Sequence, residues 1–201
     1  CVDLTDGEPT PHGTRELRAE ETAAANGILG ITERVCLELP NRVLADTEEA
    51  RRRLAALMRQ HRPDAVFTHV AHDVHPDHVA AAAITRGAVL LSRIVKIDLP
   101  HEPFRPGPVY HFLWSHLRHL HQPDFVLAAE AEDAEAKVAA VRAYASQFLA
   151  NPANAAIVDW VSRRLETDGA LGRVPQGEGF QAEEPPCLTD LTALVQVRQE
   201  R

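Results

Sequence analysis

The sequence predicts an α/β fold in which a mainly parallel, doubly wound sheet carries helices on both faces. Short apolar runs alternate with longer amphipathic segments along the first half of the chain, which is typical of strands joined by crossover helices. No internal repeat interrupts this alternation, and 45% apolar with 25% charged residues is an ordinary globular composition. Because 201 residues are enough to bury one core, we expect residues 1–201 to form a single domain.

Three strands and three helices are expected in the first half. The strands cover residues 1–5, 35–39 and 65–68, and the helices cover residues 14–29, 47–60 and 77–91. The first helix should end at Gly30, because glycine commonly closes a helix in the left-handed conformation. The second should begin with a capping box, since Asp46 is followed three residues later by Glu49.

The second half of the chain has a less regular pattern. Strands are expected at residues 109–114 and 125–128, and helices at residues 132–148 and 155–165. Residues 169–179 hold four glycines and are expected to form a loop, while residues 188–197 fit either a helix or a strand. Together these elements predict a Rossmann-like sheet, in which ligands bind at the carboxyl ends of the parallel strands.

The densest group of metal-capable side chains lies between an expected strand and an expected helix. It reads H-x-x-H-D-x-H-P-D-H over residues 69–78. Pro76 suits the first turn of the helix, so His75 and His78 should lie about one turn apart at the ligand-binding edge of the sheet. The positive end of the helix dipole favours neutral imidazole at His78, the form that ligates zinc.

Alternatives to a metal or catalytic site remain open at this point. A histidine-rich loop can simply cap the helix in contact with solvent. If His75 acts as a cation or an acid, either Asp73 or Asp77 is near enough in sequence to compensate its charge. A rival group brackets Trp114 and has no carboxylate before Asp124: His111, His116, His119 and His121.

Several functional classes are disfavoured by composition and motif. The net charge of −8 without a basic block argues against a nucleic-acid partner, and no apolar run reaches the length of a membrane span. The chain has neither a G-x-S-x-G nor a G-x-G-x-x-G motif, which disfavours a serine hydrolase and a dinucleotide fold. Its three cysteines form no C-x-x-C pair, so we expect a reducing, cytoplasmic location.

A series of motifs in order along the chain resembles the PIG-L/LmbE family of zinc-dependent N-acetylglucosaminyl deacetylases. The motifs are L-T-D-G-E at residues 4–8, G-T at 13–14 before a helix that closes on L-G at 29–30, R-P-D at 62–64, H-P-D-H at 75–78, A-Y-x-S-Q-F at 143–148 and E-G-F at 178–180. Within the family the chain is most similar to the bacillithiol-biosynthesis branch, which deacetylates N-acetylglucosaminyl malate. The resemblance extends over nearly the whole chain.

The resemblance implies roles for four residues. His78 matches a zinc ligand, and His75 matches the residue that stabilises the oxyanion and assists the leaving amine. Asp77 matches the partner that orients a histidine, and Arg18 matches an arginine that faces the substrate. On its own sequence context, Arg18 reads as a solvated or ion-paired helix residue. The resemblance further implies a zinc cofactor, a small amino-sugar conjugate as substrate, and a homo-oligomer such as a hexamer.

The sequence also departs from the family pattern. The H-P-D-D segment that supplies two zinc ligands and the base precedes, in the family, the strand that here begins at Cys1, and it is absent from these residues. We therefore expect a domain that lacks the family's first strand and its catalytic loop. Val74 and Gln176 stand where the bacillithiol branch tends to carry arginine and tyrosine.

Two alternatives follow from this departure. One is a non-catalytic protein that keeps the sugar site and has lost the metal. The other is a hydrolase that holds zinc through a different set of ligands: His72, His75, His78 and Asp73.

Overall fold

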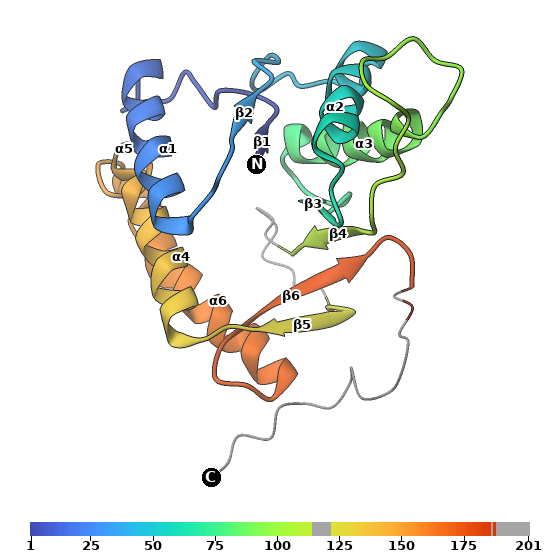
Figure 1. Ribbon diagram of the computed structural model, residues 1–201. Coiled ribbons are helices and arrows are strands. Elements are labelled where there is room, and N and C mark those ends of the chain that lie inside the picture. Colours follow the sequence, from blue (N-terminus) through green and yellow to red (C-terminus); the bar gives the residue numbers. More distant parts are fainter. Residues whose placement is uncertain (114–121, 186, 188–201) are drawn as a thin grey trace.

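The computed structural model describes residues 1–113, 122–185 and 187. Its first half contains two pairs of parallel strands (Figure 1). β1 (Val2–Asp3) pairs with β2 (Val35–Cys36), and β3 (Val66–His69) pairs with β4 (Val109–Phe112). The expected α/β class, with its parallel first half, is confirmed.

The second half adds antiparallel strands to β4. β6 (Gly177–Ala182) lies between β4 and β5 (Phe125–Ala128) and runs antiparallel to both, so the order in this sheet is β3-β4-β6-β5. The expected strand at residues 125–128 is confirmed with the same bounds. The sequence did not predict the antiparallel pairing of β6 with β4 and β5.

Helices surround these strands. They are α1 (Arg15–Leu29), α2 (Glu48–His61), α3 (Pro76–Ser92), α4 (Ala131–Ala143), α5 (Ala145–Phe148) and α6 (Ile157–Gly172), with a 3₁₀ turn at Pro152–Asn154. α2 packs against α3, and α1 packs against α4, so the helices form two groups on opposite sides of the strands (Figure 1). None of the described helices is both long and apolar enough to cross a membrane.

Local sequence signals explain where the first helices begin and end. The Thr14 hydroxyl accepts a hydrogen bond from the backbone of Leu17, and α1 closes on Gly30 with a φ of 64°, as expected. For α2 the expected capping box is wrong. The cap is Thr47, whose hydroxyl accepts from the Ala50 N–H, while the Asp46 carboxylate forms an ion pair with Arg51.

The helix expected over residues 132–148 is interrupted at Tyr144. The cause is a carboxylate from α1, a helix that is far away in the sequence but packs against α4. Glu21 of α1 accepts hydrogen bonds from both the backbone N–H and the hydroxyl of Ser146, at 2.6 and 2.8 Å. This N–H is therefore not available to continue the helical ladder, and the chain restarts as the short α5.

The glycine-rich loop expected over residues 169–179 is wrong at both ends. α6 continues to Gly172, and β6 begins at Gly177. A Cβ on Gly169 would lie 2.7 Å from the backbone of Gln176, so glycine serves here to let the helix end and the strand start approach closely.

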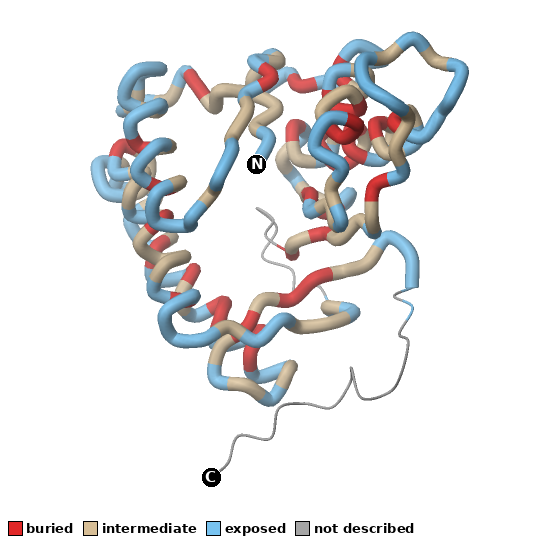
Figure 2. Tube along the Cα trace, in the orientation of Figure 1, coloured by how far each residue is buried: buried red, intermediate tan, exposed pale blue. Residues whose placement is uncertain are grey.

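The main apolar core lies between α2, α3 and the segment that leads into α2. Its buried members are Leu37, Leu44, Ala50, Leu54, Ala55, Met58, Ala81, Ile84 and Ala88. Figure 2 shows buried stretches of the trace concentrated where α2 faces α3. Burying each of the larger side chains contributes about 1.5–3 kcal/mol, so this cluster fixes the position of α3 and of the residues at its N-terminus.

Candidate functional site

A cavity of about 840 Å³ lies between β1 and β3 and is partly floored by α2 and α3. The first five residues and residues 65–69 line its two sides, and Leu54, Leu57 and Met58 of α2 give it an apolar base. Among the described residues, no strand pairs with the second edge of β1 or of β3. At the carboxyl end of β3, His69, His75 and His78 line the cavity.

The connection from β3 to α3 places the histidines at this end. His69 is the last residue of β3, and α3 begins at Pro76, whose fixed φ suits the first helical turn. His75 is the N-cap, and its Nδ1 accepts a hydrogen bond from the Asp77 backbone N–H at 3.2 Å. The expected one-turn spacing of His75 and His78 is present.

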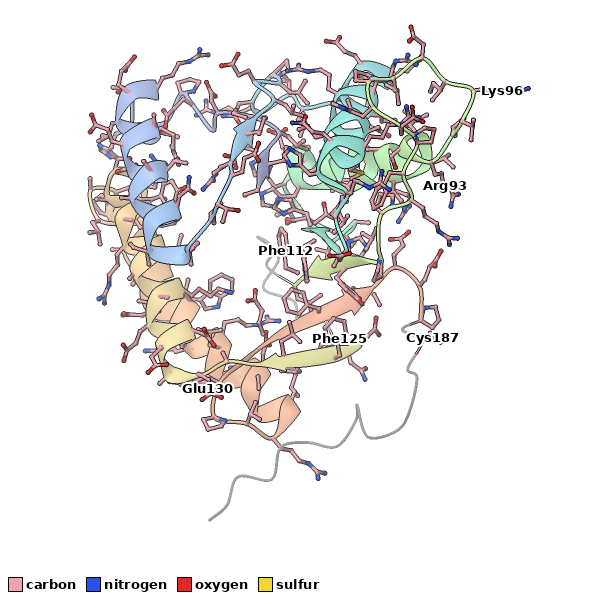
Figure 3. The ribbon with its side chains drawn as sticks, in the orientation of Figure 1. Arg93, Lys96, Phe112, Phe125, Glu130 and Cys187 are labelled. Atoms are coloured by element: carbon pink, nitrogen blue, oxygen red, sulfur yellow. The ribbon has the colours of Figure 1, made fainter. Side chains whose placement is uncertain are left out.

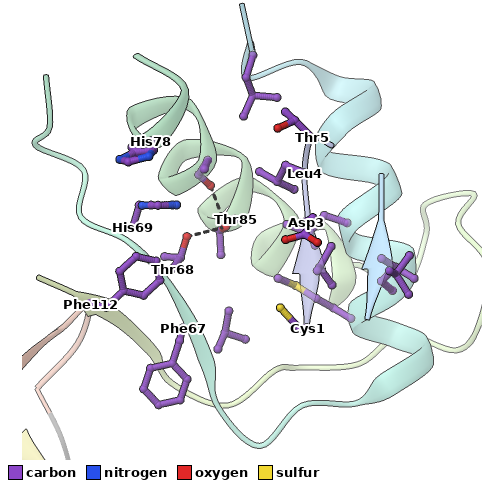
Figure 4. Close-up of a pocket in the computed structure, with 18 of the residues that line it drawn as sticks. Cys1, Asp3, Leu4, Thr5, Phe67, Thr68, His69, His78, Thr85 and Phe112 are labelled. Atoms are coloured by element: carbon purple, nitrogen blue, oxygen red, sulfur yellow. Dashed lines mark hydrogen bonds between the residues drawn. The ribbon is translucent and has the colours of Figure 1, made fainter. Parts of the chain in front are cut away.

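The rings of His69, His78 and His75 form a stack with His78 in the middle. The ring centroids of His69 and His78 are 4.0 Å apart with planes at 19°, and those of His75 and His78 are 4.7 Å apart at 21°. Figure 4 shows the first of these pairs face to face, beside the hydrogen-bonded hydroxyls of Thr68 and Thr85. The stack restricts the tilt of the central ring.

A buried carboxylate holds the central histidine. The Asp73 side chain is fully buried, and its Oδ2 lies 2.7 Å from Nδ1 of His78. Its Oδ1 accepts the backbone N–H of His75 at 3.0 Å. His72, which directly precedes Asp73 in the chain, is exposed. The loop therefore turns one carboxylate inward, toward both of the expected site histidines.

Asp77 holds a loop and does not hold a histidine ring through its carboxylate. Its Oδ2 accepts the Arg42 backbone N–H at 2.6 Å, and its Oδ1 accepts the Leu44 N–H at 3.2 Å. The side chain is buried in the first turn of α3, where the helix dipole also favours a negative charge. The residue whose carboxylate contacts a ring nitrogen of His78 is Asp73, which the sequence offered as a possible partner of His75 and as a ligand in the alternative zinc site.

Arg18 is paired with Glu8. Its Nη2 is 2.9 Å from Glu8 Oε1, and its guanidinium lies 5.6 Å from the ring centre of Tyr144. Burial raises the pKa of Glu8, but hydrogen bonds from Arg18 and Thr10 outweigh it and hold this pKa below its ordinary value. Arg18 is not among the residues that line the cavity between β1 and β3.

A second histidine network supports the edge of the site from β4. His111 is buried, with Nδ1 2.7 Å from the carbonyl oxygen of His69 and Nε2 2.7 Å from Glu183. Burial raises the pKa of Glu183, but hydrogen bonds from His111 and Arg86 outweigh this effect and hold it below its ordinary value. His111 therefore links Glu183, directly after β6, to the last residue of β3.

The rest of the rival histidine group, His116, His119 and His121, lies outside the described residues. Phe112 is the last residue of β4 (Figure 3). Its ring packs against that of His69 with 4.7 Å between centroids (Figure 4). Sequence reasoning missed both this contact and Glu183, because neither belongs to a motif near the histidines in the chain.

The described residues do not fit a zinc site with three protein ligands. Catalytic zinc is held by three side chains and a water, whereas no group of three or more His, Cys, Asp or Glu side chains in the described part of the chain could hold a metal ion. His78 offers one imidazole as a candidate ligand. The oxygens of Asp73 and Asp77 have the hydrogen-bond partners given above.

Comparisons with known proteins agree with this architecture. The family model for PIG-L, described as GlcNAc-PI de-N-acetylase, matches residues 1–89. The conserved protein TT1542 from Thermus thermophilus is 34% identical, with a TM-score of 0.84 over 94% of this chain and 82% of that chain.

Two further solved structures share the fold at 22% identity. N,N′-diacetylchitobiose deacetylase from Pyrococcus horikoshii has a TM-score of 0.75 over 96% of this chain and 76% of its own. GalB, the 4-carboxy-2-hydroxymuconate hydratase from Pseudomonas putida, has a TM-score of 0.76 over 94% of this chain and 85% of its own. At this identity the likeness concerns the fold alone.

Proposed function

The chain belongs to the PIG-L family, and on that premise we propose that it hydrolyses the acetamide bond of an N-acetylated amino sugar. The observation that carries the proposal is the pair of His75 and His78 at the carboxyl end of β3, where they line the cavity. The reaction adds one water to the amide carbonyl, breaks the C–N bond, and yields acetate and a free amine.

The hydrogen bonds of the two histidines give them complementary proton positions. Nδ1 of His75 accepts the Asp77 N–H, so a neutral His75 carries its proton on Nε2 and can donate it to an oxyanion or to the departing amine. Nδ1 of His78 faces the Asp73 carboxylate, so a neutral His78 carries a lone pair on Nε2 that can accept a proton or a metal ion.

The family description favours both the reaction class and the substrate class. The hydratase GalB shares the fold, so the fold by itself does not select between hydration and hydrolysis. The family description names a GlcNAc-PI de-N-acetylase, and this supports an N-acetylated amino sugar as the substrate.

The aglycone we propose is the malate of N-acetylglucosaminyl malate. A carboxylate on the aglycone would compete with Glu8 for Arg18, since both are anions that can accept the guanidinium hydrogen bonds. Arg18→Gln should then raise KM for the malate conjugate. It should leave unchanged the KM for methyl N-acetylglucosaminide, in which an uncharged methyl group replaces the malate. An equal effect on both substrates would contradict this use of Arg18.

Release of free amine from N-acetylglucosaminyl malate tests the proposed activity. The rates of amine release by the wild type, His75→Ala and His78→Ala should be measured with added zinc and with a chelator. Both metal conditions are needed because the described residues supply one candidate zinc ligand, His78. Each substitution should lower kcat by about 10²–10⁴-fold, the usual contribution of a positioned acid or base. The matched control is His72→Ala, an exposed histidine of the same loop.

Two results would overturn the proposal. One is the absence of amine release from the malate conjugate and from simpler N-acetylated sugars in both metal conditions, with the protein folded. The other is a wild-type rate in both His75→Ala and His78→Ala.

A further inference from the structure

We propose that Asp73 is the positioning residue of this site and that it selects which nitrogen of His78 faces the substrate. The inference deepens the proposed hydrolysis and rests on it for the assignment of a catalytic consequence. The geometry that carries it is a fully buried carboxylate bonded to one ring nitrogen of a partly exposed imidazole.

Burial makes the Asp73 carboxylate depend on its donors. Its side chain has no solvent exposure, whereas the His78 side chain is 24% exposed. A buried carboxylate without donors is costly, and when ionised it can only accept hydrogen bonds. The proton between Asp73 Oδ2 and His78 Nδ1, 2.7 Å apart, therefore belongs to the histidine.

The imidazole stack leaves a choice that this hydrogen bond resolves. A histidine ring can turn by half a rotation about its outer torsion and still lie in the same plane, stacked between His69 and His75. The stack thus fixes the ring plane without deciding which edge points toward Asp73. The hydrogen bond to Nδ1 makes the two orientations unequal and directs Nε2 away from the carboxylate.

The second oxygen of Asp73 extends the same control to the neighbouring histidine. Oδ1 accepts the backbone N–H of His75 at 3.0 Å, so one carboxylate holds both histidines of the site. Asp77 makes its carboxylate contacts to the backbone of Arg42 and Leu44 instead. The positioning of His78 is therefore assigned to Asp73.

Asp73→Asn changes the charge and the hydrogen-bonding groups of this side chain and keeps its size. The amide keeps one acceptor oxygen for the His75 N–H and turns an NH₂ group toward Nδ1 of His78. His78 should then move its proton to Nε2, which removes the lone pair from that nitrogen. We expect kcat to fall by about 10- to 100-fold with little change in KM, as for other groups that orient a functional histidine.

Long-range ¹H–¹⁵N NMR of the ¹⁵N-labelled protein reads the tautomer directly, at a pH where His78 is neutral. In the wild type, Nδ1 should give the signal of a protonated nitrogen and Nε2 that of an unprotonated one. Asp73→Asn should reverse the two signals. Asp98→Asn, a change of the same chemistry at an exposed site, should alter neither the signals nor kcat.

The outcomes are distinct for the two proposals. A wild-type His78 protonated on Nε2 would overturn the role of Asp73 even if the Asn variant did not fold, and so would unchanged signals in a folded Asp73→Asn. Because the spectra are recorded without substrate, the expected tautomer together with no amine release would contradict the proposed function and leave the orientation of His78 standing.

Discussion

Replacing Asp77 by asparagine should destabilise the fold, because its buried carboxylate accepts two backbone N–H groups, those of Arg42 and Leu44, at 2.6 and 3.2 Å. A hydrogen bond to a charged group contributes about 1.5–3 kcal/mol, and the charge at the helix N-terminus adds about 0.3–1 kcal/mol. Asparagine keeps one acceptor and turns a donor toward the other N–H. We therefore expect the free energy of unfolding to fall by about 2–4 kcal/mol.

Urea unfolding of the wild type and Asp77→Asn at neutral pH measures this loss. The matched control is Glu48→Gln, which removes an exposed charge from the first turn of α2 and should cost less than about 1 kcal/mol. An Asp77→Asn variant within about 0.5 kcal/mol of the wild type but with a strongly reduced kcat would refute the reasoning, because the carboxylate would then act in the chemistry and not on the loop.

Two further predictions concern buried charges. Arg59 is 3% exposed and donates hydrogen bonds to four backbone carbonyls. Arg59→Met should therefore lower the free energy of unfolding, measured in urea, by about 3–6 kcal/mol. A decrease below about 1 kcal/mol would contradict this account. Because the pKa of Glu8 lies below its ordinary value of 4.5, its ion pair with Arg18 stabilises the fold above about pH 4.5 and loses this effect as pH falls through the lowered pKa. The stability difference between the wild type and Glu8→Gln should therefore be full at neutral pH and shrink in acid; a difference that does not change with pH would argue against it.

The first half of the fold was predictable because its signals are local. The alternation of apolar runs, the cap at Thr14 and the stop at Gly30 all act within one or two helical turns. The break at Tyr144 was not predictable in this way. It depends on a carboxylate of Glu21 that reaches Ser146 from another helix, and no local pattern records such a contact.

The sequence was enough to predict where the site lies, but not which residues contact one another within it. The order strand, H-P-D-H and helix places His75 and His78 at the sheet edge, and the structure has them there. Which aspartate serves which partner depends on how the loop packs, so the sequence could not separate Asp73 from Asp77. The cytoplasmic location expected from composition, and the zinc and the hexamer expected from the resemblance, stay predictions.

The most direct test of the proposed hydrolysis is the fate of water oxygen during turnover of N-acetylglucosaminyl malate in H₂¹⁸O. Mass spectrometry of the products should show one ¹⁸O atom in each acetate released, with one free amine for each acetate, and His78→Ala should release both about 10²–10⁴-fold more slowly. Labelled oxygen in the sugar product without acetate would show that the protein cleaves the glycosidic bond and not the amide, and would contradict the account.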